Sequence, residues 1–307
     1  MTVSAKKYTR CVSVAARVSL AALQCSMALG QGGPGGPGGP RGGPGGNDNT
    51  PQCATDGSSA SVSTEYSTSD YLLTSSGCPP YDWSSQSTPG YAGEQRITMV
   101  LPRAPTISKN PIYLNENGGI LGPVGITTFG VPLFNALDRN GNNAYEYEGA
   151  TFDQCYGHAA GTQYHLHTVP GSRCCVPGGD AATFFAVMAD GIPVSWPEEV
   201  PEGTELDECN GFVNPRLGFY HYVATSDYPY TANCLRGCVL STFGGNNQLS
   251  ARSGECDPSD EQYDYSALHP ESVGDPAAEG GILRFDASPL DSSATVECAS
   301  GAYSLSY

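Results

Sequence analysis

The chain is organised around Tyr164-His165-Leu166-His167 and a second, closely related tetrapeptide, Tyr220-His221-Tyr222-Val223. Three of the five histidines of the chain lie in these two stretches, and a fourth, His158, precedes His165 by seven positions. In an extended strand, side chains two positions apart point to the same face. Each tetrapeptide therefore predicts a short strand, and His165 and His167 are predicted to project from one face of theirs.

The residues before the two tetrapeptides also resemble each other. Asp153-Gln154-Cys155-Tyr156-Gly157-His158 precedes the first, and Asp207-Glu208-Cys209-Asn210-Gly211-Phe212 precedes the second. Because such self-similarity is typical of repeated structural units, we predict an internal duplication, with halves at about residues 120–175 and 180–240. The two halves are expected to pack about a pseudo-twofold axis.

Together these motifs resemble the YHYH-domain family, a group of mostly secreted proteins whose biochemical activity is poorly defined. The resemblance covers roughly residues 60–240 and depends on the combination of motifs, not on any single one. The matching segments are Gly122-Pro123-Val124-Gly125-Ile126, Gly130-Val131-Pro132-Leu133-Phe134-Asn135, Asp153 to His167, Asp190-Gly191-Ile192-Pro193, Leu206-Asp207-Glu208-Cys209-Asn210-Gly211, Tyr220-His221-Tyr222 and Tyr228-Pro229-Tyr230. The chain departs from the family pattern at Val223, Phe212 and Tyr81, where the family tends to carry histidine. The resemblance therefore implies a secreted protein with a reduced set of histidines.

The first 30 residues predict a secretory signal peptide. They carry four basic residues and no acidic one, followed by an apolar run from Val18 to Leu29 and small residues at the end of that run. This run is too short to cross a bilayer, and no later segment reaches the ~20 apolar residues of a membrane span. Residues 31–59 begin with a run of glycine and proline and are predicted to be a disordered linker.

The charge of the chain excludes some partners. The full sequence has a net charge of −17, and loss of the signal peptide leaves ten basic residues against the 31 acidic ones, a net charge of −21. Such a surface repels nucleic acid and anionic lipid, so neither is an expected partner. Extracellular proteins or glycans are possible partners, since the chain has 18 tyrosines and two tryptophans.

Ten cysteines remain after removal of the signal peptide, an even number that predicts disulfides in a secreted chain. Cysteine spacing does not reveal the connectivity, although we expect Cys256 and Cys298 to hold the C-terminal part together. Residues 246–307 are polar and acidic and are predicted to be a tail outside the folded domain, which spans 60–245.

The secondary structure is predicted to be short strands separated by turns. Alternating or apolar runs at 96–101, 125–129, 183–188 and 218–224 are bounded by glycine and proline. No long window has the period of a helix, so only a few short helices are expected. The predicted fold is mainly β, rich in disulfides and loops, and arranged as a sandwich or a barrel-like domain.

The histidines are the candidate site. His165 and His167 share a strand face, His158 follows a glycine in a predicted turn, and a pseudo-twofold axis is expected to bring His221 opposite them. Three or four imidazoles without thiolate suit zinc or copper(II). Asp153 and Asp207 are predicted to accept hydrogen bonds from the ring N–H groups, outside the ligand shell.

Two alternatives remain open at this stage. The histidines could instead be core residues that hydrogen-bond to backbone in a structural or cell-surface interaction domain. A metal-assisted hydrolase or oxidase is a further possibility, but a metal site alone does not specify a reaction, and we do not expect an enzyme. The segment 138–143 resembles the start of a calcium loop, but Asn140-Gly141 within it is better explained as a hairpin turn.

Overall fold

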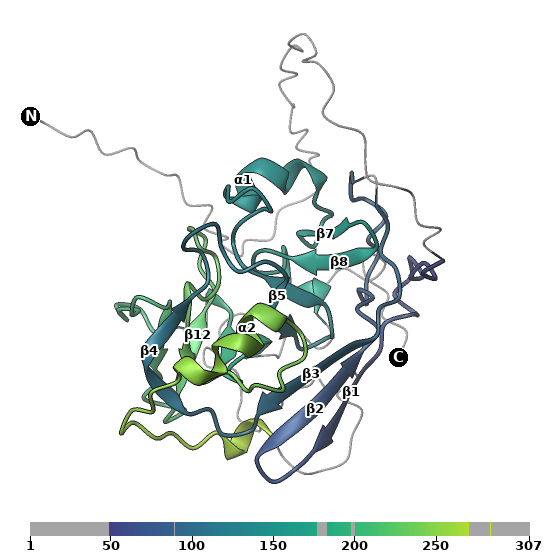
Figure 1. Cartoon of the computed structure of the whole chain (residues 1–307). Coiled ribbons are helices and arrows are strands. Elements are labelled where there is room, and N and C mark those ends of the chain that lie inside the picture. Colours follow the sequence, from purple (N-terminus) through teal and green to yellow (C-terminus); the bar gives the residue numbers. More distant parts are fainter. Residues whose placement is uncertain (1–48, 89, 177–182, 198–199, 270–282, 284–307) are drawn as a thin grey trace, which may run out of the picture. The chain divides into compact units, whose positions relative to one another are not determined.

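The computed structural model describes residues 49–269, except for residues 89, 177–182 and 198–199, together with Leu283. The predictions for the signal peptide, for residues 31–48 and for residues 270–307 other than Leu283 lie outside the described residues. The described part is mainly β, with few and short helices, as predicted (Figure 1). Its helices are α1 (Ala144–Glu148) and α2 (Asn247–Ala251), with 3-10 turns at Gly149–Thr151, Arg173–Cys175, Arg252–Glu255 and Ser266–Leu268.

The strands form three sheets. One is the antiparallel set β1 (Val62–Tyr66), β2 (Asp70–Ser75) and β3 (Ile97–Pro102), and another pairs β4 (Ile107–Tyr113) with β13 (Cys234–Gly237). The largest has eight strands: β5 (Pro123–Thr127), β6 (Pro132–Phe134), β7 (Gly157–Ala160), β8 (Gln163–Leu166), β9 (Phe184–Met188), β10 (Pro193–Ser195), β11 (Gly211–Val213) and β12 (Tyr220–Val223). All four runs predicted to be strands contribute one.

The eight-stranded sheet consists of two matching halves. Its order is β11-β12-β10-β9-β5-β6-β8-β7, so the second half runs outward from the centre in the same way as the first. The halves meet at the antiparallel pair β5–β9, where Ile126 lies opposite Val187. Since β11 and β7 are the two edges and no pairing joins them among the described residues, the sheet is open and is not a barrel.

Burial explains why the central strands are uniformly apolar. All five residues of β9 are buried, and four of the five residues of β5 are. Strands covered on both faces read as continuous apolar runs and lack an alternating pattern. The core therefore lies on both sides of the β5–β9 pair, and the outer strands of each half carry the tyrosine and histidine pairs.

Each half also contains the same turn, built by an aspartate. The Asp153 carboxylate accepts hydrogen bonds from the backbone N–H groups of Cys155 (2.8 Å) and Gly157 (3.1 Å), and from the Tyr164 hydroxyl. This carboxylate is buried, which raises its pKa to about 6. Gly157 is required because a Cβ there would overlap the Tyr164 ring and hydroxyl.

The turn in the second half has the same bonds. The Asp207 carboxylate accepts from the N–H groups of Cys209 (2.9 Å) and Gly211 (3.0 Å) and from the Tyr220 hydroxyl (2.9 Å). A Cβ at Gly211 would likewise overlap Tyr220. The Asp-x-Cys-x-Gly and Tyr-His motifs therefore form one unit, in which the aspartate fixes the turn and the tyrosine connects the turn to the strand.

Four disulfides join described residues: Cys53–Cys78, Cys155–Cys175, Cys209–Cys234 and Cys238–Cys256. The second and third anchor the two equivalent turns. The prediction of a disulfide-rich domain is confirmed, but Cys256 pairs with Cys238 and not with Cys298.

The structure also moves two predicted boundaries. In the segment assigned to the linker, Gln52 forms a β-bridge with Gly93 and Cys53 is buried by its disulfide. The predicted tail contributes α2, and Tyr265 is buried and donates from its hydroxyl to the Tyr220 carbonyl (2.8 Å). Residues 49–59 and 246–269 are therefore part of the fold, because disulfides and a few large side chains anchor segments whose composition is polar. Among the described residues, no helix has the length and apolar character needed to cross a membrane.

Candidate metal centre

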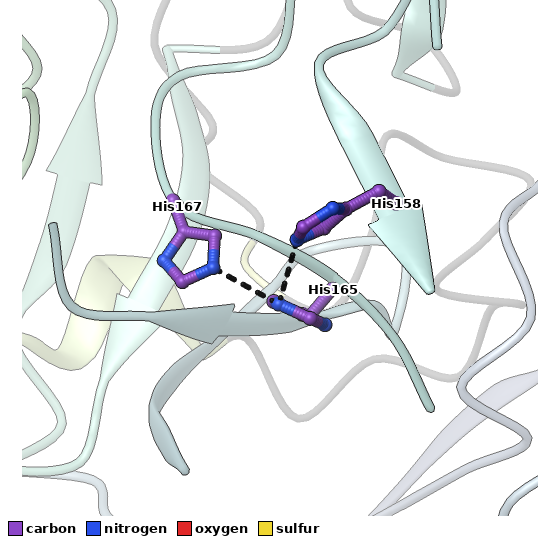
Figure 2. A group of neighbouring side chains, drawn as sticks. All are labelled: His158, His165 and His167. Atoms are coloured by element: carbon purple, nitrogen blue, oxygen red, sulfur yellow. Dashed lines mark hydrogen bonds between the residues drawn. The ribbon is translucent and has the colours of Figure 1, made fainter. Parts of the chain in front are cut away.

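Three histidines converge at the edge of the first half of the sheet. His158 on β7 lies directly opposite His165 on β8, and His167 follows two positions later on the same face. The Nε2 of His165 lies 3.2 Å from the Nε2 of His158 and 3.0 Å from the Nε2 of His167 (Figure 2). The possible ligand atoms of the three residues all lie within 4.8 Å of one another, and all three side chains are buried. The predicted common face of His165 and His167 is confirmed, whereas His158 lies in a strand and not in a turn.

The other ring nitrogens fix which tautomer each histidine adopts. The Nδ1 atoms of His165 and His167 lie 3.1 Å from the carbonyl oxygen of Gln163 and 2.7 Å from that of Asn135. A carbonyl oxygen only accepts, so both Nδ1 atoms carry the proton. In neutral imidazole, a proton on Nδ1 leaves Nε2 with a lone pair. His165 and His167 therefore point lone pairs at each other.

The tautomer of His158 is fixed in a similar way. Its Nδ1 lies 2.7 Å from the Thr151 hydroxyl, which lies 2.6 Å from the Glu148 backbone carbonyl. The single hydroxyl proton must bridge to that carbonyl, because a carbonyl has no proton to offer. Thr151 therefore accepts from the Nδ1–H of His158, and the Nε2 of His158 is a third lone pair directed at the same point.

The three histidines do not become protonated near neutral pH, so no added proton bridges their Nε2 atoms. Burial lowers the pKa of His158 and of His167 to about 4, and burial with the neighbouring His167 and His158 lowers the pKa of His165 well below its ordinary value. The three rings are therefore neutral at pH 7. Three buried acceptors face one another, and no donor from the described part of the chain lies between them, an arrangement that a bound cation satisfies.

A fourth acceptor lies beside the histidines. Glu148, the last residue of α1, places Oε2 at 3.7 Å from the Nε2 of His158 and 3.6 Å from that of His167. Burial and the nearby Asp138 raise the pKa of this carboxyl. No sequence motif marks Glu148, because a five-residue helix has no recognisable period.

The histidines and Glu148 line a pocket of about 220 Å³. Its other lining residues are Leu121, Gly122, Phe134, Asn135, Asp138, Arg139 and Ala160. The Phe134 ring stacks on His165 at 4.1 Å between centroids, which fixes the orientation of that imidazole. The group of imidazoles therefore opens onto a small space with a largely apolar wall.

His221 does not join the other three histidines. β12 and β8 are separated by five strand spacings in the sheet, roughly 24 Å at the usual 4.7–4.9 Å per strand. The prediction of a fourth ligand from the second half is wrong, because the approximate twofold axis lies between β5 and β9 and moves equivalent residues to opposite ends. The Nδ1 of His221 donates to the Tyr222 carbonyl (2.9 Å), and the Nε2 of His221 accepts from the Asn214 amide (3.1 Å).

The second half contains the equivalent positions without the site. Phe212 lies opposite His221 as His158 lies opposite His165, and Val223 takes the place of His167. The Phe212 and His221 rings are 4.8 Å apart between centroids, close to the 4.6 Å between His158 and His165. The same arrangement of strands therefore holds three imidazoles in the first half and a single imidazole in the second half, where hydrogen bonds satisfy both of its nitrogens.

The predicted roles of Asp153 and Asp207 are also corrected. Both carboxylates accept from backbone N–H groups and from a tyrosine hydroxyl, and no bond joins either one to a histidine. The groups that orient the histidines are instead the Thr151 hydroxyl and the carbonyls of Gln163 and Asn135, which sequence spacing does not identify.

The expected hairpin at Asn140-Gly141 is present, and Asp138 accepts from Asn140 and Asn142 within it, so its carboxylate closes the turn.

Comparisons of this chain with models of known protein families, with curated proteins and with solved structures find no match.

Proposed function

We propose that this chain is a secreted protein whose domain binds one transition-metal ion, zinc or copper(II), through His158, His165 and His167. The observation that carries the proposal is the convergence of three buried Nε2 lone pairs, each fixed by a hydrogen bond on the opposite side of its ring. Ligands held in this way are typical of imidazole metal sites. The absence of thiolate from the ligand group favours zinc or copper(II).

Location and family are parts of the same proposal. Four disulfides fit a chain that folds in an oxidising compartment, and the basic and apolar first 30 residues supply the argument for secretion. The motif resemblance supports membership of the YHYH-domain family. A structure of a family member with the strand order of the first half repeated in a second half would test that assignment.

The test is elemental analysis of the purified full chain, followed by titration of zinc and copper(II) into metal-free protein. We expect one ion per chain, and loss of binding in His165→Ala. The matched control is His221→Gln, which changes the equivalent histidine in the second half and should leave one ion bound.

Failure of the wild-type protein to bind either ion would overturn the proposal. It would favour a structural or cell-surface interaction domain, in which the three histidines resemble His221 as core hydrogen-bonding residues. Binding of two equivalent ions would contradict the asymmetry of the two halves. A search for turnover by a metal-assisted hydrolase or oxidase becomes useful only after a metal has been found.

A further inference from the structure

Glu148 reaches the histidines because α1 is held at both ends. The Asn143 side chain caps the first turn by accepting from the Tyr145 N–H (3.1 Å), and the Ala144 N–H donates to the Ala136 carbonyl (2.9 Å). At the other end, the Glu148 carbonyl accepts the Thr151 hydroxyl that also orients His158. The backbone of Glu148 is therefore connected to the imidazole whose Nε2 its carboxylate approaches.

The position of this carboxylate is unfavourable without a cation. Oε2 lies near two Nε2 atoms that are acceptors, and no described residue donates a hydrogen bond to the Glu148 carboxylate. A protonated Glu148 does not explain the contact either, since 3.6 and 3.7 Å are too long for an O–H···N hydrogen bond. The carboxylate oxygen thus lies beside the group of three imidazole acceptors, and a divalent ion bound between them would satisfy all four.

The distances suit a fourth ligand. Bonds of about 2.0–2.1 Å to nitrogen and oxygen in a tetrahedral site place neighbouring ligand atoms roughly 3.3–3.4 Å apart. The Glu148 oxygen lies a few tenths of an ångström farther than this from the Nε2 atoms of His158 and His167, and the Nε2 of His165 lies slightly closer than this to those two atoms. Each of these four separations is therefore within a few tenths of an ångström of that expected around a bound ion.

Glu148 also differs from the histidines in its exposure. Its side chain is 32% exposed, whereas those of His158 and His167 are 6% and 4% exposed, and it lines the same pocket. The carboxylate can therefore leave the ion by rotating toward solvent, which the buried imidazoles cannot do. The position it vacates faces a pocket large enough for a small ligand.

We infer that Glu148 supplies the fourth ligand of the ion and that a small anionic ligand entering from the pocket can replace its carboxylate. This inference rests on the proposed metal site and adds a ligand, an exchangeable position and the class of molecule that would occupy it.

The test uses the full chain loaded with copper(II), which reports its ligands by electron paramagnetic resonance. We expect Glu148→Gln to retain binding by the three histidines, with an altered spectrum and at least about tenfold weaker affinity, in the range typical of perturbed metal sites. Glu146→Gln, an exposed position on the same helix, should match the wild-type protein in both measurements. Circular dichroism of each variant checks that α1 and the sheet remain folded.

Azide tests the exchangeable position. Added to the copper(II) protein, it should change the visible and paramagnetic spectra, and it should do so at lower concentration in Glu148→Gln, where no carboxylate competes. The inference is overturned if Glu148→Gln has the wild-type spectrum and affinity, or if azide leaves the wild-type spectrum unchanged. Either result leaves the proposed three-histidine site standing as long as His165→Ala abolishes binding, whereas absence of copper binding by the wild-type protein removes both.

Discussion

The second half of the sheet supplies a natural design for removing the site. Replacing His158 by Phe and His167 by Val copies the residues at the equivalent positions, Phe212 and Val223, which the same frame already accommodates. The double variant should fold and lose its response to metal. Substitution by alanine would be a weaker test, because it would add cavities to the loss of ligands.

The size of the expected effect follows from binding linkage. An ion that binds only the folded state, at a free concentration about 100 times its dissociation constant, stabilises that state by about 2.7 kcal/mol. For a folded unit of about 200 residues this raises the melting temperature by about 5 to 10 °C. The double variant should show no such shift.

Without metal, the two proteins should be nearly equal in stability. The double variant loses the hydrogen bonds from His158 to Thr151 and from His167 to the Asn135 carbonyl, each worth about 1 kcal/mol. It also removes two buried lone pairs that face other acceptors, a change of similar size and opposite sign. The free energies of unfolding should therefore agree within about 1 kcal/mol.

Thermal and urea unfolding, followed by circular dichroism with the disulfides intact, measure both quantities. Each protein is compared after treatment with a chelator and after addition of zinc, and His221→Gln serves as the variant that should keep the metal response. A zinc-dependent shift in the double variant equal to that of the wild-type protein would refute the assignment of the ligands. A metal-free double variant that is unfolded would refute the equivalence of the two halves.

Three further predictions concern the stability of the folded domain. His221→Gln should flatten the pH dependence of the free energy of unfolding. Burial lowers the pKa of His221 to about 4, so between about pH 6.5 and pH 4 the unfolded chain binds a proton that the folded chain does not, and the folded wild-type protein loses up to about 3 kcal/mol of stability. The same dependence on pH in both proteins, measured by urea unfolding, would contradict this. Gly157→Ala should destabilise by about 1 to 3 kcal/mol or more, because its Cβ overlaps a tyrosine on β8, whereas Gly149→Ala, whose Cβ has no neighbour within 4 Å, should be close to neutral in the same assay. Replacing Cys155 and Cys175 by serine should cost about 3 kcal/mol for a loop of this length, measured against the intact protein without reductant.

The strands were predictable because their pattern is local. The tetrapeptide Tyr164 to His167 alternates as a strand does, and this alternation is sufficient to place His165 and His167 on one face. The apolar run of β9 was recognisable for a different reason, since a strand covered on both faces needs no polar positions. Fold class and the three candidate ligands His158, His165 and His167 therefore follow from the order of residues alone, although His158 was expected in a turn and lies in a strand.

The remaining parts of the site depend on contacts between distant segments. Duplication indicates which residues are equivalent but not where the axis lies, and an axis between β5 and β9 separates His221 from His165. Glu148 is brought in by a short helix in a connection of the first half, a position that no motif marks. The limits of the fold were missed for a similar reason, because one disulfide and one buried aromatic, such as Tyr265, outweigh the polar composition of the segment around them.

The two halves also separate what holds the frame from what forms the site. The aspartate turn, the tyrosine and the strand pairing occur in both halves, so these features do not require a metal. The second half satisfies its single imidazole with the Asn214 amide, a neutral donor that provides what a cation would otherwise provide. In the first half, Asn135, Gln163 and Thr151 occupy the Nδ1 side of the rings, and no amide of the described residues donates to the Nε2 side. The turn, tyrosine and strand pairing form in both halves, whether or not three histidines converge, and converging lone pairs do not stabilise the fold. Ligand binding therefore explains the three histidines better than a structural role does.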